Sequence, residues 1–323
     1  MSAASPPERR GAREQVSAAS PPERRGAGEP VRGPSVVGLG GGHGLAATLS
    51  AARRYAGDIT AVVSVADDGG SSGRLRRDFG MPAPGDIRRC LVALADDPDG
   101  AWAGAFGRRF EHGDLAGHVL GNLVIAGLAE TLGSFEAAIE EAARLLSVRG
   151  RVLPATVEPV VLVGEVSGQR LVGQKALEEA GGPITSVDID PRGAPAPAGV
   201  VAAIAAADQV VIGPGSLFTS VLAVLAVDAI REAVAARSGG VVFVCNLRPS
   251  KETIGFDVAA HVDALARHGV RPDVVLVDSA GLEPGEQRAD GPRLVNATLA
   301  RANGWSHDVG RLADALAALS SAE

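Results

Sequence analysis

The sequence predicts an α/β fold in which a doubly wound, mostly parallel, Rossmann-like sheet carries a smaller β-rich insertion. Short runs rich in Val and Ile alternate with helical periodicity along most of the 323 residues, as in parallel strands joined by helices. Two of these runs end in glycine-rich turns that open helices. Residues 151–190 differ, because short strand-like pieces are separated there by Gly and Pro.

The first half of the chain is expected to supply two strands and several helices. Residues 36–40 form an apolar run that ends in glycines, and residues 45–49 follow with helical spacing. The run ITAVVSV at 59–65 is apolar almost throughout, which is typical of a strand buried on both faces. Further helices are predicted over residues 86–95, 115–132 and 135–146.

The β-rich segment is followed by a second series of alternating elements. Inside 151–190, strand-like pieces are predicted over 157–163, 170–172 and 184–189. Later helical patterns occupy 198–206, 216–225, 256–268 and 309–319, and strands are predicted over 209–212, 241–245 and 274–277. Strands that alternate with helices in this way indicate one ordered domain over residues 34–323.

Residues 1–33 are predicted to be a disordered, repeated tail. The sequence SAASPPERRGA occurs at 2–12 and again, letter for letter, at 17–27. Such a Pro, Arg, Glu and Ala repeat cannot bury a core. An arm for an acidic partner is the alternative, but Glu8 and Glu23 dilute its positive charge.

Composition excludes several classes of protein. Lys plus Arg number 31 against 38 Asp plus Glu, and aromatic residues make up only 3%, so no nucleic-acid partner is expected. The two cysteines, Cys90 and Cys245, are far apart and belong to no metal-binding pattern, which favours a reducing compartment. No apolar run reaches the length of a membrane span, and no signal peptide is recognised. We therefore expect a cytoplasmic protein without a membrane span.

The first candidate site is the turn GLGGGHG between the first strand and its helix. Glycine lets the backbone approach a phosphate, and a helix N-terminus offers unpaired N–H groups, so the turn is a candidate phosphate cradle. Its predicted ligand-binding residues are Gly40, Gly41, Gly42, His43 and Gly44. No Gly-Lys-Ser/Thr follows, and the third glycine of a dinucleotide fingerprint is misplaced, which disfavours a Walker loop and an NAD-dependent dehydrogenase.

The second candidate site is the sequence ADDGGSSGRLR, which is expected to form one loop after the second strand. Asp67 and Asp68 suit ribose hydroxyls, a divalent cation such as Mg²⁺, or a general base. They are also the candidate catalytic residues. Ser71, Ser72 and Arg74 suit phosphate oxygens. The alternative is an Asx turn that caps the next helix.

Two further motifs each allow a structural as well as a functional interpretation. Asp86 in PGDIRR is predicted to cap the helix that follows it. His118 and Asn122 in GHVLGNL lie four residues apart in a predicted helix, so they are expected to share one face. Asn122 is a predicted ligand-binding residue, and a satisfied buried pair is the alternative.

A second glycine turn repeats the design of the first. IGPGSLFTS follows a buried strand and opens a helix, which makes Gly213, Gly215 and Ser216 candidates for a second anion site. Asn246 ends a third strand with a polar amide. Because parallel strands place their carboxyl ends at one edge, these groups together predict a nucleotide-sized cleft.

Seven motifs in this order resemble those of the YvcK-type gluconeogenesis factors of the CofD-like superfamily. They are GGGHG, VADDGGSSGRLR, PGDIRR, GHVLGNL, VLPAT, IGPGSLFTSVL and NLRPSKETIGF. This chain departs from the usual family pattern at His43, Arg89 and Lys251, where Thr, Asn and Gly are common. Another branch of the superfamily contains 2-phospho-L-lactate transferases of deazaflavin coenzyme biosynthesis.

The resemblance implies a Rossmann-like fold that binds a UDP-sugar such as UDP-N-acetylglucosamine. It also implies a regulatory role in cell shape, peptidoglycan supply and growth on gluconeogenic carbon sources, with no firmly assigned reaction and no firm cofactor. The alternative is a Mg²⁺-dependent transferase of the phospholactate type, with Asp67 and Asp68 holding the metal. A homodimer is compatible with a sheet-edge cleft.

Overall fold

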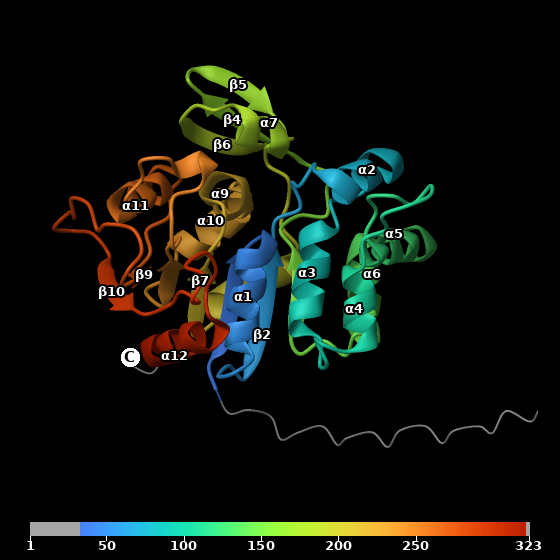
Figure 1. The fold of residues 1–323 in the computed structure, drawn as a ribbon, viewed down its shortest axis with the longest axis horizontal. Coiled ribbons are helices and arrows are strands. Elements are labelled where there is room, and N and C mark those ends of the chain that lie inside the picture. The colour runs from blue at the N-terminus through green and yellow to red at the C-terminus, as the bar shows by residue number, and fades with distance from the viewer. Residues whose placement is uncertain (1–32, 321–323) are drawn as a thin grey trace, which may run out of the picture. The chain divides into compact units, whose positions relative to one another are not determined.

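In the computed structural model, which describes residues 33–320, a seven-stranded parallel sheet forms the centre of the domain (Figure 1). Its order is β10-β9-β8-β7-β1-β2-β3. The strands are β1 (Ser35–Gly40), β2 (Asp58–Val63), β3 (Arg151–Pro154), β7 (Gln209–Ile212), β8 (Val241–Val244), β9 (Val274–Asp278) and β10 (Arg293–Ala297). The doubly wound α/β fold is confirmed. Residues 1–32 of the predicted tail lie outside the described residues.

Helices follow most strands, as right-handed crossovers in a parallel sheet require. They are α1 (Gly42–Ala52), α2 (Gly70–Phe79), α3 (Gly85–Leu94), α4 (Ala101–Gly107), α5 (Leu120–Leu132), α6 (Phe135–Leu145), α8 (Ala198–Ala206), α9 (Leu222–Leu225), α10 (Asp228–Ala235), α11 (Val258–Arg267) and α12 (Val309–Ser320). Helix α1 packs between α3 and α12 (Figure 1). Helix α8 packs against α10. Within residues 33–320, no helix is both long and apolar enough to cross a membrane.

The predicted β-rich insertion is a separate three-stranded antiparallel sheet. Its order is β5-β4-β6, with β4 (Val161–Val166), β5 (Gln169–Val172) and β6 (Ile184–Asp190), and α7 (Gln174–Glu179) follows β5. The β4–β5 hairpin turns through Ser167 and Gly168, whose φ angles of 50° and 78° suit a two-residue turn. Strand β3, at the start of segment 151–190, pairs with β2 in the large sheet instead.

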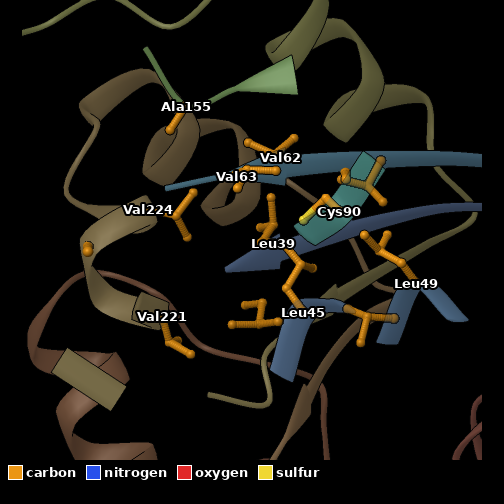
Figure 2. Close-up of a cluster of buried hydrophobic side chains, with 14 of the residues drawn as sticks. Leu39, Leu45, Leu49, Val62, Val63, Cys90, Ala155, Val221 and Val224 are labelled. Atoms are coloured by element: carbon orange, nitrogen blue, oxygen red, sulfur yellow. The ribbon is translucent and has the colours of Figure 1, made fainter. Parts of the chain in front are cut away.

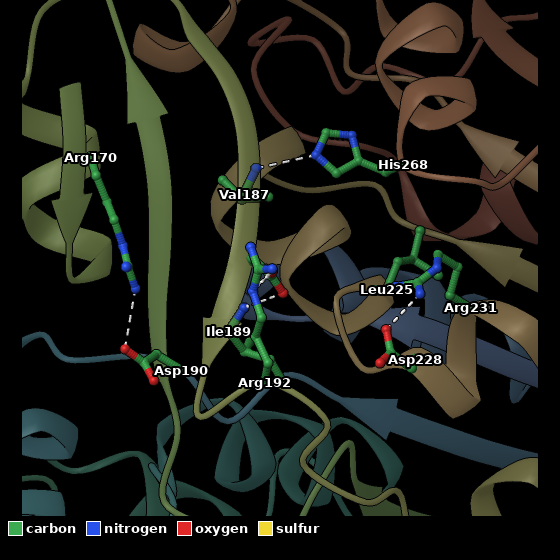
Figure 3. Close-up of polar contacts among 10 residues, drawn as sticks. Arg170, Val187, Ile189, Asp190, Arg192, Leu225, Asp228, Arg231 and His268 are labelled. Carbon is green, nitrogen blue, oxygen red and sulfur yellow. Dashed lines mark hydrogen bonds and ion pairs between the residues drawn. The ribbon is translucent and has the colours of Figure 1, made fainter. Parts of the chain in front are cut away.

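The small sheet is joined to α11 through one histidine (Figure 3). The N–H of Val187 in β6 donates to Nε2 of His268 over 3.2 Å, and Nδ1 of the same ring is 2.8 Å from the Ala264 carbonyl. Since Nε2 accepts, Nδ1 carries the proton and donates. Burial lowers the pKa of His268, which is consistent with this neutral form.

The core lies between the large sheet and its helices (Figure 2). Leu39 and Val62 from neighbouring strands are fully buried, and Leu45 and Leu49 of α1 pack against the strand at Gly38. Cys90 is buried in the same cluster with a free thiol. Strands buried on both faces explain the near-continuous apolar runs in the sequence.

Several predicted elements are corrected by the structure. The helix predicted over 115–132 begins only at Leu120, because Gly117 has a φ of 80° and Val119 pairs with Arg109 in an isolated bridge. The acidic motif is not one loop, since its second half forms α2. The helix predicted over 216–225 begins as a π-helical turn, η1 (Leu217–Val221), before α9. Strands β3 and β10 and helices α4, α7 and α10 were not predicted.

Candidate functional site

The two glycine turns lie at the topological switch point of the sheet. Strand β1 stands between β2 and β7, and the chain leaves β1 toward β2 and leaves β7 toward β8 on the other side. Connections therefore diverge at the carboxyl ends of β1 and β7, where open α/β sheets bind ligands. A Cβ added to Gly40 would lie 4.0 Å from Cα of Gly213. The structure thus places the two turns side by side.

The turns also interlock. A Cβ added to Gly44 would overlap the carbonyl oxygen of Pro214 in the second turn. Gly42 has a φ of 65° with nothing within 4 Å of an added Cβ, so its glycine serves the left-handed backbone rather than a close approach. Glycine is therefore needed at these two positions for different physical reasons.

A cavity of about 540 Å³ opens beside the turns. Four segments contribute to its walls: the first turn with α1, the second turn, the loop after β8, and the loop before α12. The lining residues are His43, Gly44, Ala47, Pro214, Gly215, Asn246, Leu247, Arg248, Pro249, Ser250, Arg301, Trp305, Ser306, His307 and Val309. Its volume is in the range of small-molecule sites. Of the predicted ligand-binding residues, His43, Gly44, Gly215 and Asn246 line it directly.

Sequence reasoning missed the wall formed by the last loop. The guanidinium carbon of Arg248 lies 5.6 Å from the ring centroid of Trp305, and its Nε donates to the Gly304 carbonyl over 2.9 Å. Arg301 and His307 complete this wall. Arg301, Trp305 and His307, which lie within seven residues, were the available signal in the sequence. They follow strand β10, and because that strand was not predicted, the loop could not be placed beside the sheet.

Asp278 anchors the loop before α12, the cavity wall that the sequence did not predict. It ends β9, is 6% exposed, and its carboxylate accepts the N–H groups of Leu299 over 2.6 Å, Ala300 over 2.9 Å and Ala280 over 3.1 Å. The two donors Leu299 and Ala300 tie the start of the loop that leads to Trp305 to this carboxylate, and the third, Ala280, lies just after β9. The cavity wall is therefore anchored to the sheet.

Two imidazoles face the cavity in the neutral form. Nε2 of His307 is buried without a hydrogen-bond partner among residues 33–320, and burial lowers its pKa. The pKa of His43 is lowered by burial and then by the positive charge of Arg89. A neutral imidazole offers one donor and one acceptor, which suits recognition of polar groups on a base or sugar.

At the first turn, a carboxylate already occupies one backbone donor. The N–H of Gly42 donates to Oδ2 of Asp86 over 2.7 Å, and the other carboxylate oxygen is paired with Arg89. The predicted capping role of Asp86 is wrong: α3 begins at Gly85, Pro84 is its N-cap, and no side chain caps it. Asp86 lies within the first turn of helix α3, and its carboxylate accepts the Gly42 N–H at the start of α1 instead.

At the second turn, the donors are more fully engaged. Glu252 lies in the short 3-10 helix η2 (Lys251–Thr253) and accepts the N–H groups of Phe218 over 3.0 Å and Thr219 over 3.3 Å, as well as the Thr219 hydroxyl. The N–H of Gly215 donates to Oδ1 of Asn246 over 3.2 Å. Burial raises the pKa of Glu252. The predicted role of Ser216 in anion binding stays a prediction.

The adjacent carboxylates of the acidic motif point to different elements. Oδ1 of Asp67 accepts the N–H of Gly69 over 2.9 Å in an Asx turn, whereas Oδ1 of Asp68 accepts the N–H of Lys175 over 3.1 Å in the first turn of α7. Burial is the main cause that raises the pKa of Asp67, and Asp86 raises it further. The charge of Asp86 therefore acts on Asp67 although the two residues are far apart in the sequence, and these two carboxylates are the candidates to share a cation. Across residues 33–320, no group of three or more His, Cys, Asp or Glu side chains could hold a metal.

The other predicted ligand-binding residues of the acidic motif are buried or hydrogen-bonded to neighbouring parts of the domain. Ser71 and Ser72 are each 3% exposed, and Oγ of Ser71 accepts the Val119 N–H over 3.3 Å. Arg74 donates to the Ala116 carbonyl over 3.0 Å. Their part in ligand binding stays a prediction.

The predicted His118–Asn122 pair is wrong. His118 precedes α5, and its Nδ1 lies 3.3 Å from Oγ of Ser71. Oδ1 of Asn122 accepts from Nε of Arg88 over 3.0 Å. Val119, the N-cap of α5, is extended at φ −107° and ψ 130°, so the helical register that the pairing required does not reach His118.

Comparisons with known proteins agree on one family. The family described as 2-phospho-L-lactate transferase CofD matches residues 36–314. A gluconeogenesis factor of Mycobacterium leprae is 42% identical over 305 residues, which covers 88% of this chain and 85% of the relative. A relative of the same description from Nostoc sp. is 44% identical over 252 residues, but the chain spans only 55% of its length.

The fold comparison points in the same direction. A crystal structure of a UPF0052 family protein from Bacillus halodurans superimposes with a TM-score of 0.80 at 34% sequence identity. The match covers 88% of this chain and 98% of that protein.

Proposed function

The chain belongs to the CofD family and, within it, to the gluconeogenesis factors, and from this premise we propose that it binds a nucleotide sugar of the UDP-N-acetylglucosamine type as a regulatory protein. The proposed role is cytoplasmic, serving cell shape, peptidoglycan supply and growth on gluconeogenic carbon sources. Both cysteines are buried free thiols, which suits a reducing compartment.

The observation that carries the proposal is the cavity at the switch point. It joins two glycine turns to a wall that presents Arg248, Arg301 and Trp305. Arginine side chains suit phosphate oxygens, and an aromatic ring beside them suits a base or sugar face. The amide of Asn246 and the ring of His307, both in the cavity lining, supply polar groups for directional hydrogen bonds. The cavity therefore offers groups for each part of a nucleotide sugar.

Calorimetry with UDP-N-acetylglucosamine, UDP and N-acetylglucosamine tests this proposal. We expect the nucleotide sugar to bind, and His307→Phe to weaken binding about fivefold, since one hydrogen bond is worth about 1 kcal/mol. His112→Phe, at an exposed position that does not line the cavity, is the control and should bind as the parent chain does. Equal affinity of parent and His307→Phe would exclude this ligand pose, and no binding of any UDP-sugar would exclude the function.

A second candidate function is a Mg²⁺-dependent transferase of the 2-phospho-L-lactate type. The family description and the electrostatic proximity of Asp67 and Asp86 favour it. When bound, Mg²⁺ would neutralise phosphate charge, and these two carboxylates are the residues available to hold it, since Asp68 is bonded to α7 instead. Product formation from a nucleoside-diphosphate donor of phospholactate, only with Mg²⁺, would favour the transferase. Metal-independent binding without turnover would favour the regulator.

A homodimer is also proposed for this protein. Sedimentation at several concentrations, with and without the nucleotide sugar, tests it. A constant monomer mass under both conditions would reject it.

A further inference from the structure

Arg88 in α3 is a buried arginine whose charge is not matched by an ion pair. The residue is 8% exposed, and no carboxylate oxygen lies within 4.0 Å of its guanidinium in the part of the chain that the structure describes. Its one hydrogen bond runs from Nε to Oδ1 of Asn122 over 3.0 Å. Both Nη groups lack an acceptor among the same described residues, and neither is fully enclosed by protein, so both are within reach of a ligand. Buried arginines are normally paired, so this arrangement requires an explanation.

The start of α5 holds Arg88 in one orientation. Asn122 is 2% exposed, so its amide gives Nε a fixed acceptor. A Cβ added to Gly121 would lie 2.7 Å from the Phe106 carbonyl oxygen and 2.8 Å from Cδ of Arg88, so glycine makes room for that carbonyl and for the arginine stem. Two residues of the GHVLGNL motif thus serve Arg88. A guanidinium that is fixed through Nε presents its two Nη groups as a ready fork.

The surroundings of Arg88 leave positive charge in excess. Burial, and after it the positive charge of Arg89, lower the pKa of Arg88 to about 10, while Asp86 opposes this effect. The Asp86 carboxylate is already bonded to Arg89 and to the Gly42 N–H. Arg109 adds a third positive charge nearby. A bound anion would relieve this repulsion and satisfy the free donors.

We propose that Arg88 is the fork of an oxyanion-binding site, in which its two Nη groups bind one phosphoryl or carboxylate group of a small ligand and Asn122 holds the fork in place. None of Arg88, Arg89, Arg109 and Asn122 lines the cavity beside the glycine turns. The site is therefore distinct in its residues from the proposed nucleotide-sugar cavity, and it does not depend on that function.

Calorimetry of the full chain with inorganic phosphate and, separately, with acetate tests the site and distinguishes its two ligand chemistries. Arg88→Met should weaken binding of the preferred anion at least tenfold, and Asn122→Ala should weaken it less, because the fork is then only loosened. Arg88→Lys should not restore the parent affinity, since an ammonium group has no planar fork.

Arg237→Met is the matched control, because each guanidinium nitrogen of Arg237 already donates to a backbone carbonyl. It should leave anion binding unchanged. If Arg88→Met does not fold, the Nη resonances of Arg88 in the parent chain provide the readout, and they should shift on titration with the anion. Three results would each overturn the proposal. They are the absence of binding by both phosphate and acetate, Nη resonances that do not shift, and binding by Arg88→Lys that equals that of the parent chain. Titration of UDP-N-acetylglucosamine alongside separates this outcome from failure of the nucleotide-sugar proposal.

Discussion

The two glycine turns have the same local design but different backbone hydrogen bonding. In the first, only the Gly42 N–H is bonded to a side chain, that of Asp86, and the turn opens a regular helix. In the second, Glu252 takes two successive N–H groups and Asn246 takes another. The second turn is thus a rigid wall with its donors engaged, whereas the first retains donors for a ligand.

This difference shows that a glycine turn before a helix is not by itself an anion site. The helix N-terminus attracts negative charge of any origin, and a protein carboxylate satisfies it as well as a phosphate does. At the second turn that carboxylate is Glu252, from a loop more than thirty residues further along the chain. The predictions below test how far the two turns differ.

The largest effect is expected from Gly44→Ala. The added Cβ overlaps the Pro214 carbonyl, so the interlocked turns must separate, at a cost of about 3 kcal/mol or more in unfolding free energy. Gly42→Ala meets no atom and should cost only about 1 kcal/mol, from its left-handed backbone. Urea unfolding measures both. Equal losses would show that the turns do not interlock.

Glu252→Ala should destabilise the protein by about 2–4 kcal/mol, because it leaves the buried N–H groups of Phe218 and Thr219 unpaired. Asp86→Ala frees a single backbone donor and should cost about 1–2 kcal/mol. Thermal and urea unfolding give the comparison. A larger loss for Asp86→Ala would reverse the ranking of the two turns.

The difference in stability between the parent chain and Glu252→Gln, followed as a function of pH, should report the ionisation of Glu252. Burial raises the pKa of Glu252 above its usual 4.5, so folding disfavours the ionised form. As pH rises from 4.5 through the raised pKa, the parent chain should lose stability relative to Glu252→Gln, which cannot ionise. The difference in unfolding free energy between the two proteins, measured from pH 4 to 8, checks this. A difference independent of pH contradicts it.

The smallest effect concerns ligand affinity at the first turn. Asp86→Asn removes a negative charge from the N-terminus of α1 and should tighten binding of UDP about two- to fivefold. Asp228→Asn is the control, because Asp228 pairs with Arg231 three residues on in the first turn of α10, away from the cavity. Weaker binding by Asp86→Asn would instead support a cation held by Asp67 and Asp86.

The sequence determined the class of fold and where along the chain the candidate glycine turns lie. Runs such as ITAVVSV indicate buried strands, and Gly40 and Gly213 mark the ends of two strands, because apolar periodicity and glycine are local signals. The edge of the sheet at which a site forms follows from that pattern and from the parallel arrangement. These inferences needed no knowledge of distant contacts.

Only the tertiary structure decided which donors remain free and what covers the cavity. The partner of Phe218 is Glu252, that of Asn122 is Arg88, and Trp305 reaches the cavity from the far end of the chain. Such pairings join residues far apart in sequence, and many carboxylates could serve each helix N-terminus equally well by propensity. A local pattern therefore predicts that a turn attracts an anion, whereas the packing of the whole domain selects which one.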